Sequence, residues 1–358
     1  MTVFSVMTWN VENLFPPNPA DKDNTARPPD LDTYFRKLEY LRLIIEEGLK
    51  PDNDSPTVIA LQEVGDIAAV QGQVYNPIKD LQSRLGGAYP HAYTGIPDGR
   101  GIRVALLSKL PLTGVQNWVD FPFGLFKFSV MQGMSADTEV TRMGRGAVKA
   151  TVEVEKGLRV HLVTTHLKSK LVTYTAPYGK YPLWNPPNEY ERTRELGFAS
   201  LRRIAEAAAV RSRILDLITS NDDPLVLMGD LNDEQQAAST AMFYGEWEPI
   251  VDSAPKPGDK IKFTRKILSA NKKIDDTRLY NLADVIQPER RYSRINDGRK
   301  ELIDHILVTR DLALATTRVD ALVANLESIG VNRDARQKEV IPDHAPVYAI
   351  FEVAAPKK

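Results

Sequence analysis

Five short polar clusters interrupt the apolar runs of this chain of 358 residues, and each cluster lies where a strand-like segment begins or ends. They are Trp9-Asn10, Gln62-Glu63, Thr165-His166, Gly229-Asp230-Leu231-Asn232 and Asp343-His344. Together they supply carboxylates, amides and imidazoles, which are the groups that metal-assisted hydrolysis of a phosphate ester requires. An enzyme is therefore the leading hypothesis.

The apolar runs themselves are short, often β-branched and bounded by turn residues, which predicts buried strands. These runs cover residues 3–9, 58–61, 104–107, 158–164, 225–228, 303–308 and 345–353. Apolar residues at helical spacing predict helices near 34–45 and 78–85, and a longer one near 198–218 that polar Arg211 and Ser212 interrupt. Since helices separate only some strand pairs, we expect a mixed sheet or two sheets.

Cysteine is absent, which excludes disulfides, thiolate metal ligands and a cysteine nucleophile. The remaining ligand types suit a hard ion such as Mg²⁺ or Mn²⁺ where carboxylates dominate. The formal net charge is -1, so any attraction to nucleic acid must come from a local surface. The first residues lack the pattern of a secretory signal and no apolar stretch is long enough to cross a bilayer, so we expect a cytoplasmic protein.

The segment 225–232 places an aspartate and an asparagine just after an apolar strand. Asp230 could orient and deprotonate a water molecule there, and the Asn232 amide could donate hydrogen bonds to charge that builds on a phosphoryl oxygen. The alternative is a simple turn, which Gly, Asp and Asn all favour. Glu63 and Asn10 emerge from strands in the same way. Taken singly, such a glutamate is usually a solvated cap or an ion-pair partner, and the Asn10 amide could ligate a metal or begin a loop.

His166 ends an apolar run and precedes Lys168 and Lys170, a setting that suits an anionic ligand. Asp304 and His344 begin two late strands. We pair them, because an aspartate bonded to one imidazole nitrogen fixes the tautomer and leaves the other nitrogen for a phosphate or a leaving group. For the other histidines we expect a loop (His91), a core or sheet-face position (His161) and packing on the opposite strand face (His305).

In this order, the motifs resemble those of the endonuclease/exonuclease/phosphatase superfamily, which has the DNase I-like fold. The matching motifs are Trp-Asn at 9, Leu-Gln-Glu at 61, Thr-His-Leu at 165, Gly-Asp-Leu-Asn at 229, Ile-Asp-His-Ile-Leu at 303 and Asp-His-Ala-Pro-Val at 343. The segments 104–111 and 145–150 are also similar. The resemblance covers nearly the whole chain.

The resemblance implies an α/β fold, a four-layer sandwich in which two mixed β-sheets pack face to face with helices on the outer faces. The site would lie along one edge where the two sheets meet. A single domain is expected over residues 1–358, with insertions near 16–30, 171–190 and 253–281. Because long irregular loops are uncommon unless functional or disordered, the insertions are candidates for substrate-facing segments or for exposed decoration.

The resemblance also implies a metal site for Mg²⁺ or Mn²⁺. Glu63 would be the principal ligand, with Asn10 and Asp343 nearby, binding the ion directly or through water. These three assignments are carried over from the family motifs, position by position.

Five further residues take catalytic roles by the same resemblance. Asp230 would position the nucleophilic water, and Asn232 would hold the phosphate. His166 and the Asp304-oriented His344 would stabilise the transition state or protonate the leaving oxygen. Which histidine is the acid is open at this stage.

The resemblance favours a hydrolase acting on nucleic acid, a phosphodiesterase of the DNA endonuclease or exonuclease type. Lys168, Arg145 and Tyr292 are expected substrate contacts. The stretch 253–281 carries eight Lys and Arg residues against three Asp, which suggests a surface for the nucleic-acid backbone. The loop after His166 adds aromatic residues that could stack on bases or only pin the loop. They are Tyr174, Tyr178, Tyr181, Trp184 and Tyr190.

The runner-up is a phosphomonoesterase or a phospholipid-cleaving relative, such as an inositol-phosphate phosphatase or a sphingomyelinase. Against the inositol 5-phosphatases, the segment 300–307 departs from their Pro-x-Trp-x-Asp-Arg-x-Leu pattern. Against the apurinic-site and exonuclease branch, His166 stands where another residue is usual. A non-catalytic scaffold would be expected to have lost at least one catalytic group, and none is missing.

Overall fold

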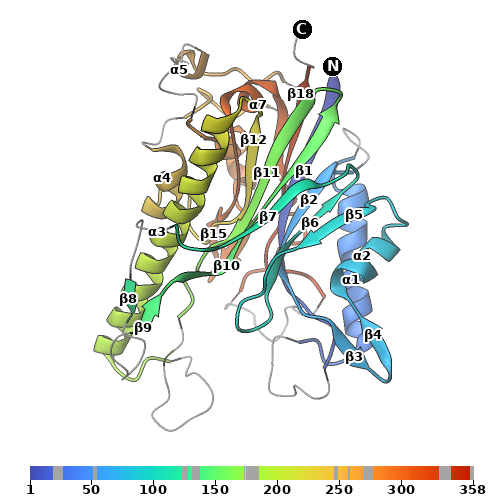
Figure 1. Cartoon of the computed structure of the whole chain (residues 1–358), viewed down its shortest axis with the longest axis vertical. Helices are drawn as coiled ribbons and strands as arrows, with labels where there is room; N and C mark the ends of the chain where they lie inside the picture. The colour runs from blue at the N-terminus through green and yellow to red at the C-terminus, as the bar shows by residue number, and fades with distance from the viewer. Residues whose placement is uncertain are drawn as a thin grey trace.

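The computed structural model describes residues 1–18, 27–50, 55–122, 128–130, 138–172, 174, 185–245, 249–256, 259–268, 277–329 and 340–354. Within these residues two six-stranded sheets pack face to face, and helices cover their outer faces (Figure 1). The predicted four-layer α/β sandwich is therefore confirmed. The single domain over 1–358 stays a prediction.

The first sheet holds the beginning and the end of the chain. Its strands, in spatial order, are β17 (Thr316–Ala321), β18 (Val347–Val353), β1 (Thr2–Leu14), β2 (Val58–Val64), β6 (Arg103–Ser108) and β5 (His91–Thr94). β1 and β2 are parallel, with Asn10 opposite Gln62, and the other pairs are antiparallel. The sheet is mixed, as predicted.

The second sheet is built from the middle of the chain. Its strands, in spatial order, are β13 (Tyr280–Asn281), β16 (Asp304–Val308), β12 (Leu225–Asp230), β11 (Leu158–His166), β10 (Arg142–Glu155) and β7 (Thr113–Asp120). β11 and β12 are parallel, with His166 opposite Asp230, and β16 returns antiparallel with Asp304 opposite Asp230. Three polar residues of the sequence motifs are thus neighbours in one sheet.

Helices and short hairpins complete the chain. The helices are α1 (Leu31–Glu47), α2 (Pro77–Arg84), α3 (Glu189–Ser220), α4 (Ala238–Tyr244), α5 (Arg265–Leu268) and α7 (Arg310–Ala315), with 3-10 turns at Leu282–Val285 and Pro288–Arg290. The hairpins pair β3 (Ala68–Val70) with β4 (Gln73–Tyr75), β8 (Phe128–Val130) with β9 (Thr138–Val140), and β14 (Arg294–Asn296) with β15 (Arg299–Glu301). None of the helices in the described ranges is both long and apolar enough to cross a membrane.

Buried strands with two apolar faces explain why the sequence shows continuous apolar runs. In β1, Phe4 and Val6 lie in the core between the sheets, whereas Met7 and Trp9 pack in a second core beneath α1 and α2. A third core lies between the second sheet and α3 with α4. Alternate residues of a strand point to opposite faces, so a strand buried on both sides must be apolar throughout.

Several local predictions need correction. α3 runs unbroken past Arg211, which donates a hydrogen bond to the Thr277 carbonyl oxygen (2.5 Å), because a polar side chain can leave a helix face without ending the helix. His91 lies in strand β5 and not in a loop. The stretch 253–281 is not irregular throughout, since it contains α5 and ends in β13. Its residues 269–276 lie outside the described ranges.

Candidate active site

A buried hydrogen bond joins the ends of two strands that belong to different sheets. The amide nitrogen Nδ2 of Asn10 in β1 donates to Oδ2 of Asp230, the last residue of β12 (2.9 Å). The backbone N–H of Glu12 donates to Asn10 Oδ1 (2.9 Å), which fixes the orientation of the amide. Two motifs separated by most of the chain therefore meet at one edge of the sandwich.

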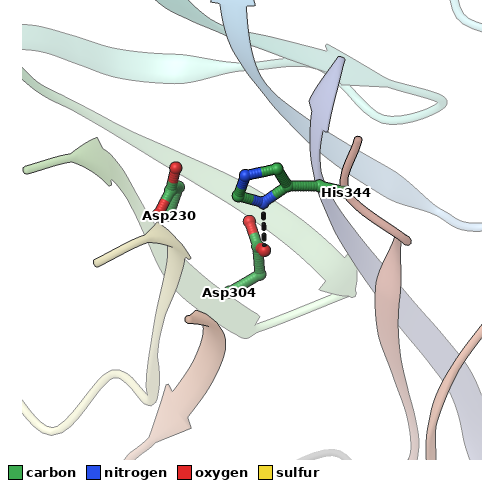
Figure 2. A group of neighbouring side chains, drawn as sticks. All are labelled: Asp230, Asp304 and His344. Carbon is green, nitrogen blue, oxygen red and sulfur yellow. Dashed lines mark hydrogen bonds and ion pairs between the residues drawn. The ribbon is translucent and has the colours of Figure 1, made fainter. Parts of the chain in front are cut away.

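Asp304 and His344 form the expected pair. Nδ1 of the His344 ring lies 2.6 Å from Oδ2 of Asp304, and Figure 2 shows this pair with Asp230 on the neighbouring strand. Both backbones are also held: the indole of Trp9 donates to the His344 carbonyl oxygen (2.7 Å), and the Asp304 N–H donates to Oγ of Ser293 (3.2 Å). The imidazole is therefore oriented from several sides.

His166 lies on the other flank of Asp230. Its Nε2 is 3.3 Å from Asp230 Oδ2, and its buried Nδ1 has no hydrogen-bond partner among the described residues. Burial, together with the positive charges of Arg145 and His344, lowers the pKa of His166 well below its ordinary value. His166 is therefore a neutral imidazole at physiological pH.

The Gly-Asp-Leu-Asn motif does more than make a turn. A Cβ atom on Gly229 would lie 2.0 Å from the Thr165 carbonyl oxygen, so only glycine allows this close approach of β12 to β11. Asn232 has a left-handed backbone (φ +54°), and its N–H donates to Asp230 Oδ1 (2.8 Å). Its side-chain amide donates to the Leu167 carbonyl oxygen (3.1 Å). The motif thus fixes Oδ1 of Asp230 and the segment after His166, while Asn10 holds Oδ2.

Glu63 and Asp343 lie on the first-sheet side of this edge. Glu63 follows Gln62, whose backbone is opposite Asn10, and its Oε2 accepts a hydrogen bond from the Asn13 N–H (3.0 Å). Asp343 precedes His344, and Oδ1 of Asp343 is 4.0 Å from Nε2 of that ring. Both side chains are partly exposed. They are within the same part of the fold as Asn10, as the sequence motifs implied.

The buried acids and the histidine perturb one another. Burial and the nearby Asp304 carboxylate raise the pKa of Asp230 to about 7. Burial by itself lowers the pKa of His344, but the carboxylates of Asp304 and Asp343 outweigh it and raise this pKa to about 10. At neutral pH His344 carries a proton on both ring nitrogens, while Asp230 is present in both its protonated and its ionised form.

The acidic cluster fits a hard cation. One potential ligand atom from each of Asp230, Asp304 and His344 lies within 4.8 Å of the others. Oδ1 of Asp304 is buried and accepts no hydrogen bond from the described residues. The charged His344 ring balances one of the two buried carboxylates, so a further positive charge would stabilise the ionised form of the other. The cluster is therefore consistent with a metal site, although Glu63 is not one of these three residues.

Two of the three expected substrate contacts, Arg145 and Lys168, lie beside His166, and the third, Tyr292, packs against Lys300. Arg145 is buried, and its Nη1 donates to the Leu167 carbonyl oxygen (3.2 Å), directly beside His166. The Lys168 ammonium group donates to the Leu171 carbonyl oxygen (2.9 Å), and burial with the charge of Arg145 lowers its pKa to about 8. Tyr292 is buried beneath the Lys300 ammonium group, which is 4.3 Å from the ring centroid.

Within the basic stretch 253–281, the described helix lies away from the candidate site. Its helix α5 is held by Arg310, which donates to the carbonyl oxygens of Ile267 and Leu268 (both 3.1 Å). Arg310 follows the end of β16, whereas Asp304 begins that strand. In Figure 1, α5 lies at the same end of the molecule as the two chain termini. Strand direction thus separates helix α5 from the candidate site.

Of the aromatic candidates that follow His166, two are described, and Arg290 and Arg291, which precede Asp304, bind the protein's own groups. Tyr174 is buried and Tyr190 is exposed at the start of α3, while Tyr178, Tyr181 and Trp184 lie outside the described residues. Arg290 binds Asp320 (2.8 Å), and Arg291 donates to the carbonyl oxygens of Asp284 and Ile286 (both 2.9 Å). Both arginines hold the protein's own backbone or carboxylates, so they have little capacity to contact a phosphate.

The sequence pattern did not single out Glu206 of α3, a residue that supports the site. Glu206 is buried, and its carboxylate accepts hydrogen bonds from the N–H groups of Gly144 (2.8 Å) and Lys168 (2.7 Å). Gly144 precedes Arg145, and Lys168 follows Leu167. Glu206 therefore binds the backbone next to both residues of the Arg145–Leu167 hydrogen bond. The available signal was a glutamate within the otherwise apolar run 204–210 of this helix.

Replacing Glu206 with alanine is expected to lower both stability and turnover. Two buried N–H groups would lose their acceptor, at about 1–3 kcal/mol each, and Arg145 and His166 would lose their support. Glu206→Gln, which keeps one acceptor oxygen, should give an intermediate loss. Glu191→Ala is the matched control on α3, because Glu191 binds only at the surface with Arg194 (2.5 Å). A Glu206→Ala variant with the melting temperature and the turnover of wild type would contradict this role for the Glu206 hydrogen bonds.

Comparisons with known proteins agree with this fold and site. The chain belongs to the endonuclease/exonuclease/phosphatase family, whose sequence profile matches residues 7–326. The protein is thus a phosphoesterase of this family with a buried Asp230, Asp304 and His344 cluster. Family members act on nucleic acids or other phosphoesters. A comparison with curated protein sequences gave no match.

Two solved structures illustrate the shared fold. A protein of the same family from Bacteroides thetaiotaomicron is 15% identical, with 99% of each chain covered and a TM-score of 0.50. ANGEL2, described as a 2′,3′-cyclic phosphatase in complex with adenosine-2′,3′-vanadate, is 14% identical, with 98% of this chain and 95% of its own covered and a TM-score of 0.55. At such identities the likeness supports the fold alone.

Proposed function

We propose that this protein is a divalent-metal phosphodiesterase that hydrolyses nucleic acid, with DNA as the leading substrate and Mg²⁺ or Mn²⁺ as the cofactor. The observation that carries the proposal is the buried meeting of Asn10 and Asp230 from opposite sheets beside the Asp304–His344 pair. An amide, a carboxylate of raised pKa and a charged imidazole at one point suit the cleavage of a phosphate ester.

Asp230 is the proposed base. Its pKa of about 7 means that a substantial fraction is ionised at neutral pH and can take a proton from the attacking water. Hydrogen bonds from Asn10 to Oδ2 and from the Asn232 N–H to Oδ1 hold the carboxylate in one orientation. The second N–H of the Asn232 amide would bind a phosphoryl oxygen.

His344 is the proposed acid. Asp304 accepts a hydrogen bond from the Nδ1–H group, so Nε2 of the charged ring is left to donate its proton to the leaving oxygen. His166 is unsuited to that step, because its low pKa keeps it neutral. It would instead donate a hydrogen bond to the phosphate from the ring nitrogen that carries its proton. These assignments divide the two histidines by charge.

Glu63, Asn10 and Asp343 are the residues we propose to hold the metal. His344 is a poorer choice among the nearby groups, because its Nδ1 already binds Asp304 and its other nitrogen is protonated at neutral pH. A bound Mg²⁺ or Mn²⁺ would supply stabilisation of negative charge on the phosphoryl oxygens. The unpartnered, buried Asp304 oxygen supports a cation close by.

A panel of phosphate esters tests the substrate class. With Mg²⁺ or Mn²⁺ present, we expect cleavage of plasmid and linear DNA and of bis-p-nitrophenyl phosphate, and much slower release of phosphate from inositol phosphates. RNA and sphingomyelin complete the panel. Rates are measured as kcat/KM for each substrate at one salt concentration. A preference for a monoester or for sphingomyelin would replace the nuclease proposal with the runner-up.

A further inference from the structure

We propose that Arg100 binds the phosphate next to the scissile one, so that the preferred substrate is a strand with consecutive phosphates and not a compound with a single phosphate. The inference rests on the proposed function and deepens it by naming a substrate class. Arg100 lies outside every motif that the sequence pattern singled out. Three features of Arg100 support this role: the rigid turn that carries it, the position of that turn between the two sheets and the charged groups nearby.

A tight turn presents the Arg100 side chain to solvent. The backbone closes with hydrogen bonds from the Asp98 N–H to the Ile102 carbonyl oxygen (2.8 Å) and from the Gly101 N–H to the Asp98 carbonyl oxygen (3.0 Å). Oδ1 of Asp98 also accepts from the N–H groups of Arg100 (2.8 Å) and Ile102 (3.0 Å). The Arg100 side chain remains 63% exposed. A rigid backbone beneath an exposed guanidinium lowers the entropic cost of binding an anion.

The turn lies between the two halves of the site. On one side, a Cβ on Gly101 would be 2.3 Å from Oδ2 of Asp66, which comes three residues after Glu63. On the other side, Nε of Arg145 in β10 is 3.6 Å from Oδ2 of Asp98. Asp66 follows a strand of the first sheet, and Arg145 belongs to the second. Arg100 is therefore carried on the rim of the edge where the sheets meet.

Two guanidinium groups meet one carboxylate at Asp98, and the nearby Asp66 is paired with Arg103. Arg100 Nη2 and Arg145 Nε both approach the same Asp98 oxygen, at 3.5 and 3.6 Å, so one carboxylate serves two guanidinium groups. Both distances exceed those of a good hydrogen bond, and Arg145 Nε has no hydrogen-bond partner among the described residues. Arg100 is also close enough to His166 and Lys168 to lower the pKa of each. An anion entering here would gain a charge-assisted contact.

This arrangement distinguishes classes of phosphate ester. A compound with one phosphate can occupy the centre formed by Asp230 and His344 without reaching the rim. In a nucleic-acid strand, the neighbouring phosphate extends away from the centre and can meet Arg100, whose planar fork matches two phosphate oxygens. Arg100 should therefore contribute to binding a strand and contribute nothing to the cleavage of a single diester.

The test compares Arg100→Ala with wild type on two substrates in Mg²⁺. For a short single-stranded oligonucleotide, kcat/KM should fall about 10-fold, mainly through KM, as expected for the loss of one charge-assisted hydrogen bond. The slope of log kcat/KM against log salt should shrink by about 1. Turnover of bis-p-nitrophenyl phosphate should not change. Arg100→Lys keeps the charge and loses the planar guanidinium group. Its kcat/KM on the oligonucleotide should lie between the values of wild type and Arg100→Ala.

Arg159→Ala is the matched control. Its side chain is 60% exposed and pairs with one aspartate, Asp223 (2.8 Å), but it lies at the start of β11, away from His166 at the end of that strand. It should behave as wild type on both substrates. A second pair of substrates is a dinucleotide with and without a terminal phosphate. Wild type should cleave the phosphorylated form faster, and Arg100→Ala should cleave both forms alike.

The possible results separate this inference from the proposed function. If wild type cleaves both substrates and Arg100→Ala is unchanged on the oligonucleotide, the inference is wrong and the proposed function stands. An equal loss on both substrates would also overturn it, since the turn would then only support Arg145. If wild type cleaves neither substrate with added metal, the proposed function itself fails, and the assignment of Arg100 fails with it.

Discussion

Changing His344 to asparagine is expected to lower kcat by about 10²–10⁴-fold, which is the usual contribution of a positioned general acid. Asparagine can still donate a hydrogen bond to Asp304 in place of Nδ1, but it has neither the second ring nitrogen nor the positive charge. The fold should therefore persist while the proton donor is lost. The measurement is kcat on DNA, whose alkoxide leaving group needs protonation, with thermal unfolding recorded for each variant.

His161→Asn is the control for the loss of a buried histidine. His161 lies early in β11 and bonds to Thr151 (2.9 Å) and Asn221 (3.1 Å), not to any residue of the candidate site. Its variant should keep turnover close to wild type even if its stability falls. Should His344→Asn retain wild-type kcat, His344 is not the acid and the division of roles between the two histidines is wrong.

Metal binding is expected to stabilise the protein far more at about pH 8 than at about pH 5. Burial and Asp304 raise the pKa of Asp230 to about 7, so this carboxyl is mostly protonated at the lower pH and ionised at the higher one. A neighbouring cation favours the ionised form, so protons compete with the metal below pH 7. Over about two pH units the affinity should rise by at most about 100-fold, or about 2.7 kcal/mol in ligand-linked stability, which is the limit for a carboxyl that must be fully ionised when the metal binds.

The measurement is the Tm of the protein in EDTA and in saturating Mg²⁺ or Mn²⁺ at each pH. In EDTA, hydrolysis should stop, and it should return when metal is restored. Without metal, ionisation of Asp230 opposes folding. Because its pKa is higher in the folded state than in the unfolded state, the free energy of unfolding falls as pH rises towards the folded-state value. Glu63→Ala should raise the metal concentration needed for both effects. A metal-induced Tm change that is the same at both pH values would refute the coupling to Asp230.

Much of the fold follows from local sequence pattern. The runs at 225–228 and 303–308 predicted β12 and β16 because strands buried on both faces must be apolar in every position. The spacing of Tyr34, Leu38 and Leu41 predicted α1, and all three are buried beneath the first sheet. β7 was not predicted, because it is an edge strand whose residues are mostly exposed and carry little apolar pattern.

The order of polar motifs likewise indicated which residues belong to the site, since each motif stands where a strand stops or starts. Asp230 and His166 were singled out in this way before any contact was known. Arg100 and Glu206 were not, because a turn arginine and a helical glutamate are ordinary in sequence. Only their neighbours in space, Asp98 with Arg145 for the first and Gly144 with Lys168 for the second, give them a role.

The strands, the first helices and the polar groups that end the strands follow from the sequence, because these features depend on which neighbours along the chain are apolar. The tertiary structure decided how those groups combine. The bond from Asn10 to Asp230 depends on how the two sheets pack and on strand register, and so do the distance and the burial of the Asp304–His344 pair. Such contacts are set by the burial of whole sheet faces, and no local pattern records them.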